Sequence, residues 1–63
     1  MRKELLTLLY KRIEQCRDDL ERWEDLYSLI PITFASLKSH VERMIMNKQM
    51  ELNKLLKLEF ILN

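Results

Sequence analysis

The 63-residue sequence contains no glycine, one proline and one cysteine. Without glycine, and with a single proline, it has almost none of the turn chemistry that β-hairpins and β-meanders require. One cysteine cannot form an internal disulfide, which excludes a disulfide-stapled secreted miniprotein. The short chain has room for one domain, so the sequence predicts a single all-α domain over residues 1–63.

The sequence also lacks an excess of either charge and any long apolar run. Eleven basic residues face ten acidic ones, and 48% of the residues are hydrophobic. This composition excludes a disordered chain and argues against non-specific nucleic-acid binding as the main role. The apolar stretch near the N-terminus is too short for a signal peptide or a membrane span, and Lys11 and Arg12 follow it directly. We therefore expect an intracellular protein without membrane association, in the cytoplasm or alternatively the nucleus.

The single proline, Pro31, predicts where the chain turns. Proline lacks an N–H and disfavours helix at the preceding residue, so a first helix should cover about residues 2–29, followed by a turn at about 30–33. Thr33 is the expected N-cap of a second helix over about 34–61, with Ile32 and Leu37 spaced as a hydrophobic staple. A short connection makes the two helices antiparallel. One long helix kinked at Pro31 is the alternative.

Apolar side chains recur along the first helix at alternating spacings of three and four residues. This spacing is the a/d repeat of a coiled coil. Leu5 and Leu26 flank the repeat and widen it to the apolar face of a helix bundle. We expect Cys16 to be a small buried hydrophobic residue within the repeat. The predicted seam consists of Leu6, Leu9, Ile13, Cys16, Leu20, Trp23, Tyr27 and Ile30.

The second helix has a broader and less regular apolar face, with Lys48 in its middle and Glu59 also on it. Antiparallel pairing places Lys48 near the level of Ile13 to Cys16. We expect its ammonium group to reach the edge of the seam, toward Glu14 or Asp19. Alternatively, Lys48 selects the register or the oligomeric state. The predicted apolar face comprises Phe34, Leu37, Val41, Met44, Ile45, Leu52, Leu55, Leu56 and Leu62.

Two helices that share one seam leave one side of each helix in water. The apolar residues left over should form an exposed patch, which usually marks an interaction site: Leu5, Leu8, Met46, Met50, Leu58 and Ile61. We therefore predict a coiled-coil-like hairpin that dimerises into a four-helix bundle. The predicted oligomer or partner interface comprises Leu6, Leu9, Ile13, Leu20, Trp23, Tyr27, Val41, Ile45, Met46, Met50, Leu52 and Leu55.

Charged residues form two further candidate surfaces. An acidic stripe on the first helix, opposite the seam, could be a solvated face or a docking surface for a basic protein partner; it consists of Glu14, Asp18, Glu21 and Asp25. A basic cluster at the start of the first helix should lie beside Lys54 and Lys57, and a dimeric hairpin could bind RNA or DNA through it. This cluster consists of Arg2, Lys3, Lys11 and Arg12.

The chain offers little for catalysis. His40 is the sole histidine, too few for a metal site built on one chain. No nucleophile–base set, metal set or phosphate-binding loop is present, so we expect no enzyme activity and no cofactor. The aromatic residues Trp23, Tyr27 and Phe34 are expected to pack in the core near the turn. The sequence predicts a small non-enzymatic interaction module, meaning a regulator, inhibitor or adaptor. The alternatives are a dimeric RNA- or DNA-binding protein and an obligate subunit of a hetero-oligomer.

Overall fold

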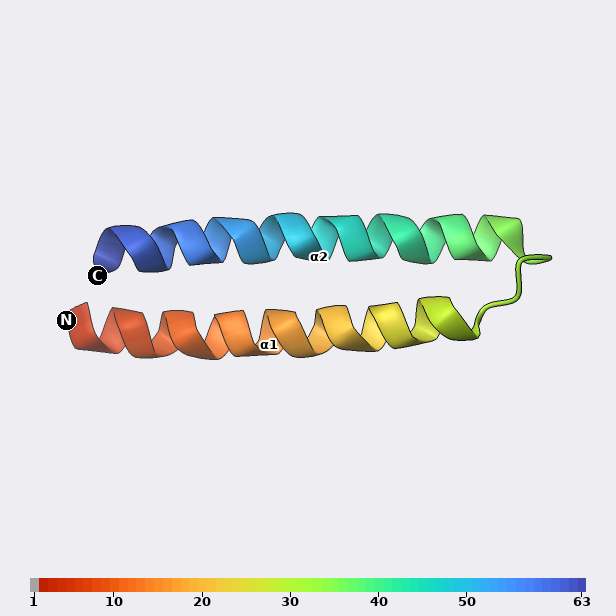
Figure 1. The fold of residues 1–63 in the computed structure, drawn as a ribbon. Coiled ribbons are helices and arrows are strands. Elements are labelled where there is room, and N and C mark those ends of the chain that lie inside the picture. Colours follow the sequence, from red (N-terminus) through yellow and green to blue (C-terminus); the bar gives the residue numbers. More distant parts are fainter. Residues whose placement is uncertain (1) are drawn as a thin grey trace.

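The computed structural model describes residues 2–63 as two α-helices, with no strand among these residues. Helix α1 spans Arg2–Leu29 and helix α2 spans Ala35–Leu62, each of 28 residues. The helices lie side by side and antiparallel, so that the start of α1 and the end of α2 share one end of the molecule (Figure 1). The predicted all-α, two-helix fold is confirmed.

The turn between the helices is held by backbone hydrogen bonds on both sides of the proline. The Ile30 N–H donates to the Tyr27 carbonyl at 3.3 Å, and the Phe34 N–H donates to the Pro31 carbonyl at 3.0 Å. Pro31 itself has no N–H to continue α1, so the chain leaves the helix at this point. The result is a compact turn that reverses the chain direction (Figure 1).

The start of α2 differs from the prediction. Phe34, and not Thr33, is the N-cap, and no side chain caps the helix. The first helical hydrogen bond runs from the Lys38 N–H to the Phe34 carbonyl at 3.0 Å. Thr33 instead belongs to the turn that the hydrogen bond from the Phe34 N–H to the Pro31 carbonyl closes. The helix therefore begins one residue later than a Thr33 cap requires.

Few side chains are fully enclosed. Ile13, Cys16, Ile30 and Val41 are the hydrophobic residues buried in residues 2–63, and Val41 is only 1% exposed. The molecule measures 50 × 15 × 11 Å, with a radius of gyration of 14.7 Å. A compact domain of this length has a radius of gyration of about 10.6 Å. The core is thus a narrow line between two rods.

Neither helix of residues 2–63 contains an apolar stretch long enough to cross a membrane.

Candidate functional site

The seam between the helices has the same spacing on both. On α1, and at Ile30 just after it, every predicted seam residue is buried or half-buried. On α2 the buried and half-buried residues include a series with alternating spacings of three and four: Lys38, Val41, Ile45, Lys48, Leu52, Leu55, Glu59 and Leu62. This is the a/d repeat of a coiled coil. Three charged residues therefore occupy seam positions on α2, whereas α1 has none.

The structure divides the predicted interface residues into two groups. Most lie in the seam and pack α1 against α2 within one molecule: Leu6, Leu9, Ile13, Leu20, Trp23, Tyr27, Val41, Ile45, Leu52 and Leu55. Met46 and Met50 instead lie on the surface, 57% and 58% exposed. Most of the predicted interface residues therefore make contacts within one hairpin, and the surface that a partner could reach is formed mainly by other residues.

Two residues assigned to the apolar face of α2 are not covered. Phe34 and Leu37 are 58% and 52% exposed, so the hairpin does not cover this end of the predicted apolar face. Phe34 is the N-cap, outside the helix proper, and its backbone does not continue the helical direction. The predicted aromatic core therefore reduces to Trp23 and Tyr27, which are both half-buried.

Lys48 lies in the seam and sends its ammonium group to the edge. Its Nζ is 3.5 Å from Asp19 Oδ2 and 3.5 Å from Glu51 Oε2. The ion pair with Asp19 agrees with the expected route of this side chain, and Glu51 is an additional partner. The side chain remains 23% exposed, so the charge keeps contact with water.

Cys16 lies opposite Lys48, at the level that antiparallel pairing predicts. Its Sγ donates to the Lys48 carbonyl at 3.4 Å, and the residue is 2% exposed. Burial raises the pKa of the Cys16 thiol, and the nearby Glu51 carboxylate raises it further, while Lys48 and Arg12 act in the opposite direction. A protonated, enclosed thiol is a poor nucleophile, so Cys16 has a structural role.

Arg12 and Glu51 form a short ion pair across the seam, with 2.5 Å between Nη2 and Oε1. The hydrogen bond from Arg12 holds the pKa of Glu51 below its ordinary value; burial opposes this, and the Lys48 charge supports it. Together with Asp19 and Lys48, these residues form a four-membered charged cluster. Two of its members are cations and two are anions, so the cluster is close to neutral.

Lys38 occupies the seam position beside the turn. Its Nζ donates to the Ile30 carbonyl at 3.4 Å and lies 4.7 Å from the centre of the Tyr27 ring. The last turn of α1 contains no basic residue of its own. Lys38 therefore supplies, from the neighbouring helix, the positive charge that favours the C-terminal end of a helix dipole.

The seam has two edges, and cross-helix pairs identify which residues share each edge. Arg12 pairs with Glu51 on the first edge, and the Asn63 side-chain amide donates to the Tyr10 hydroxyl on the second, at 3.4 Å. In a heptad repeat, residues seven positions apart point in the same direction. The first edge therefore contains the residues that lie seven or fourteen positions before or after Arg12 on α1 and Glu51 on α2. A residue three positions after any of these edge residues lies next to it, on the side away from the seam.

The first edge is rich in exposed leucine. We call this surface the leucine face, and its apolar members are Leu5, Leu8, Leu26 and Leu29 of α1 with Leu37, Leu58 and Ile61 of α2. These side chains are between 44% and 78% exposed. They form two apolar groups, one near the chain ends and one near the turn. The charged cluster of Arg12, Asp19, Lys48 and Glu51 lies between the two groups.

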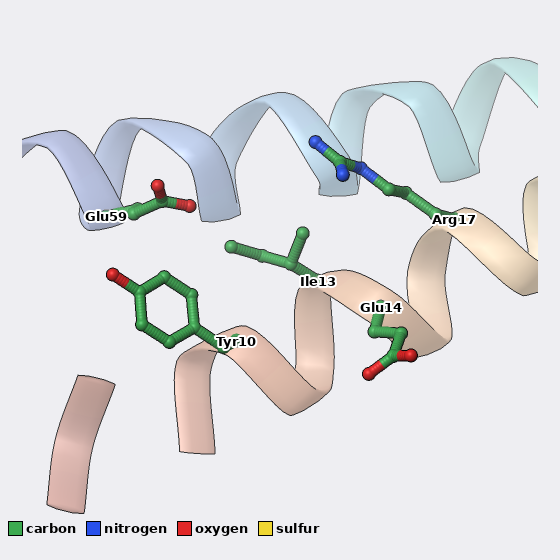
Figure 2. Close-up of a pocket in the computed structure, with 5 residues that line it drawn as sticks. All are labelled: Tyr10, Ile13, Glu14, Arg17 and Glu59. Atoms are coloured by element: carbon green, nitrogen blue, oxygen red, sulfur yellow. The ribbon is translucent and has the colours of Figure 1, made fainter. Parts of the chain in front are cut away.

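The second edge is polar and has a shallow groove of about 430 Å³. It is lined by Tyr10, Ile13, Glu14 and Arg17 of α1 and by Glu59 of α2. Tyr10 and Arg17 extend toward α2, whereas Glu14 points away from it (Figure 2). No member of this set is a thiol, imidazole or aliphatic hydroxyl.

The predicted charged surfaces are exposed. Each residue of the acidic stripe lies on the surface, and none of its four members forms an ion pair with another part of residues 2–63. The basic cluster is exposed as well, but Arg12 is paired with Glu51. Exposed His40 has no metal-binding neighbours, because residues 2–63 contain no group of three or more His, Cys, Asp or Glu side chains that could hold an ion.

Comparisons with protein-family models, with curated proteins and with solved structures found no match for this chain.

Proposed function

We propose that the chain is a small non-enzymatic protein-interaction module whose hairpins pair as homodimers into a four-helix bundle. The observation that supports this is the surface that one hairpin exposes, 5428 Å². A compact monomer of 7.8 kDa exposes about 4,400 Å². The hairpin thus exposes about 1,000 Å² more than such a monomer, and its exposed residues include large apolar side chains, which are unfavourable in water.

The acidic stripe supports a role in regulation or as an adaptor. Its four carboxylates lie opposite the seam, so pairing of hairpins through another surface leaves them exposed to a basic protein partner. Nucleic-acid binding is less well supported, because Glu51 neutralises Arg12, one of the four members of the basic cluster. The proposed module thus assembles through apolar surface and recognises its partner through the acidic stripe.

Sedimentation equilibrium of the purified chain over a range of concentrations tests the assembly. We expect a mass of about 15.6 kDa, twice that of the 7.8-kDa chain, with dissociation only on dilution. A fully helical species that keeps the single-chain mass at every concentration would contradict the proposed dimer. A chain that aggregates alone and becomes monodisperse only with a different protein would instead identify an obligate subunit of a hetero-oligomer.

A further inference from the structure

The leucine face is the surface on which, we infer, the second copy of the chain docks; this inference rests on the homodimer proposed above and names its interface. Of the two edges of the seam, only this one combines apolar residues from both helices at both ends of the molecule. A second hairpin laid along it would cover Leu5 and Leu58 near the chain ends, and Leu26 and Leu37 near the turn.

The second edge does not offer an equivalent surface. Residues seven positions from Tyr10 on α1 are Lys3 and Arg17, and residues at seven-residue intervals before Asn63 on α2 include Gln49 and Glu42. The same series on α2 also contains the half-buried Leu56, and Tyr10 is 46% exposed, so docking a copy there would bury some apolar surface but would also remove these charged and amide groups from water. Exposed apolar side chains are thus concentrated on one edge of the seam, which is typical of an interface and not of scattered surface residues.

The size of the uncovered surface also fits a second copy. One partner of a standard stable interface loses about 800 Å² of accessible surface. The hairpin exposes 5428 Å², about 1,000 Å² more than a compact monomer of its mass. This difference is comparable to the surface that one partner loses in a standard interface, which is consistent with docking of one second copy.

The charges on the leucine face are complementary to a copy of the same face. Arg12 and Glu51 lie at the same level of the hairpin because they form an ion pair. A twofold axis along the helices places Arg12 of one copy opposite Glu51 of the other, and the reverse pair forms by symmetry. The acidic stripe, in contrast, would oppose carboxylates to carboxylates and repel its copy. The charged cluster thus favours self-association on this face and restricts its register.

Sedimentation equilibrium of two matched double variants tests this inference, because it measures the dissociation constant of the dimer. Leu5→Glu with Leu58→Glu places a charge on the leucine face from each helix, at residues that are 55% and 48% exposed. Because each change occurs twice in a symmetric dimer, we expect the dissociation constant to rise about 100-fold or more. The control, Met46→Glu with Met50→Glu, alters two residues of equal exposure, 57% and 58%, away from this face. We expect it to change the constant less than about threefold.

Fluorescence of the unmodified protein provides a test that does not depend on folding of a variant. Trp23 is the sole tryptophan, and it lines a groove with Asp19, Arg22 and Leu26 beside the leucine face. Docking on this face should shift the Trp23 emission to shorter wavelength and reduce its quenching by acrylamide as the protein concentration increases, with the same midpoint as the mass change.

Each outcome of the two tests has a definite meaning. A dimer that survives charging of the leucine face, or that leaves Trp23 quenching unchanged, would overturn this inference and leave the proposed dimer intact. Loss of the dimer only in the Met46 and Met50 variant would place the interface on the other side of α2. Absence of any dimer in the unmodified protein would overturn both the interface and the homodimer.

Discussion

The two helices contribute unequally to the seam that joins them. The seven seam residues of α1, together with Ile30, include no charged side chain, whereas Lys38, Lys48 and Glu59 occupy equivalent positions on α2. A seam between only two helices is narrow, so a long side chain that starts in it can still bring its charge to an edge. Lys48 does so beside Asp19, and Lys38 does so over Tyr27.

The two kinds of seam position contribute differently to the free energy of folding and to the specificity of helix pairing. Apolar contacts concentrate where apolar residues of the two helices meet. Ile13 on α1 and Val41 on α2, at different levels of the hairpin, are among the buried residues, 5% and 1% exposed. The charged α2 positions contribute little apolar burial, but they pair with particular residues on α1. We therefore assign stability mainly to the first group and register mainly to the second.

The largest expected effect comes from removing an apolar seam residue. Ile13→Ala should lower the free energy of unfolding by about 3 kcal/mol, because it removes buried methyl groups and leaves a cavity that two rigid helices cannot close. Chemical denaturation followed by circular dichroism at one fixed chain concentration measures this change. Met50→Ala, at a position that is 58% exposed and lies outside both the seam and the leucine face, is the control and should change the stability by less than about 0.5 kcal/mol.

An equal loss in the two variants would show that burial in the seam is not what stabilises the hairpin. The comparison between the helices would then have no energetic basis. Fixed chain concentration is needed because dimer formation makes the apparent stability depend on concentration.

A smaller effect of opposite sign is expected at the charged seam position in the middle of α2. Lys48→Met replaces a charge by an apolar side chain and should raise the free energy of unfolding by about 1 kcal/mol. Glu51 retains Arg12 as a partner, and Cys16 retains its hydrogen bond because the acceptor is the Lys48 backbone carbonyl. Denaturation measures the stability, and sedimentation measures whether the protein keeps one oligomeric state.

Lys57→Met is the matched control, since Lys57 lies on the exposed surface of the same helix. It should leave both the stability and the mass distribution nearly unchanged. If Lys48→Met lowers the stability instead, the ion pairs to Asp19 and Glu51 stabilise the hairpin more than apolar burial would.

The difference between an apolar seam on α1 and a partly charged seam on α2 also explains which seam residues could be predicted from the sequence. The seam on α1 and at Ile30 was predictable residue by residue, because all eight positions are apolar and the spacing is uninterrupted. On α2, the predicted apolar face was assigned from the apolar residues alone. It therefore included Phe34 and Leu37 and omitted Lys38, which is charged. Extending the spacing of Val41, Ile45 and Lys48 backward by three residues would have found Lys38.

The remaining features depend on atoms from different parts of the chain. Thr33 has the right residue type for an N-cap, but the hydrogen bond from Phe34 to Pro31 determines where the helix begins. The level of Lys48 opposite Cys16 was predictable from antiparallel pairing, and the hydrogen bond between them confirms it. The pairing of Arg12 with Glu51 could not be predicted without knowing which residues of α1 and α2 lie at the same level. The two edges of the seam are defined from such pairs and could not be predicted either.

The smallest expected effect is the pH dependence of the Arg12–Glu51 pair. The pKa of Glu51 is lower in the folded chain than its ordinary value of 4.5, chiefly because Arg12 donates a hydrogen bond to the carboxylate. A lowered pKa means that the unfolded chain binds the proton more tightly. The stabilisation is therefore complete above about pH 4.5 and is lost as the pH falls through the lower, folded-state pKa.

Arg12→Ala should remove most of this dependence. Glu51 is 32% exposed and the pair is open to salt, so we expect a loss of only about 0.5 kcal/mol near neutral pH. Because the wild-type protein loses the same contribution on acidification, the two stability curves should converge at pH values below the lowered folded-state pKa of Glu51. Lys11→Ala removes an equal charge from the adjacent, exposed position and should leave the wild-type pH profile in place. If the curves of unfolding free energy against pH for Arg12→Ala and wild type stay parallel down to acid pH, the Arg12–Glu51 pair does not make the stability depend on protonation of Glu51.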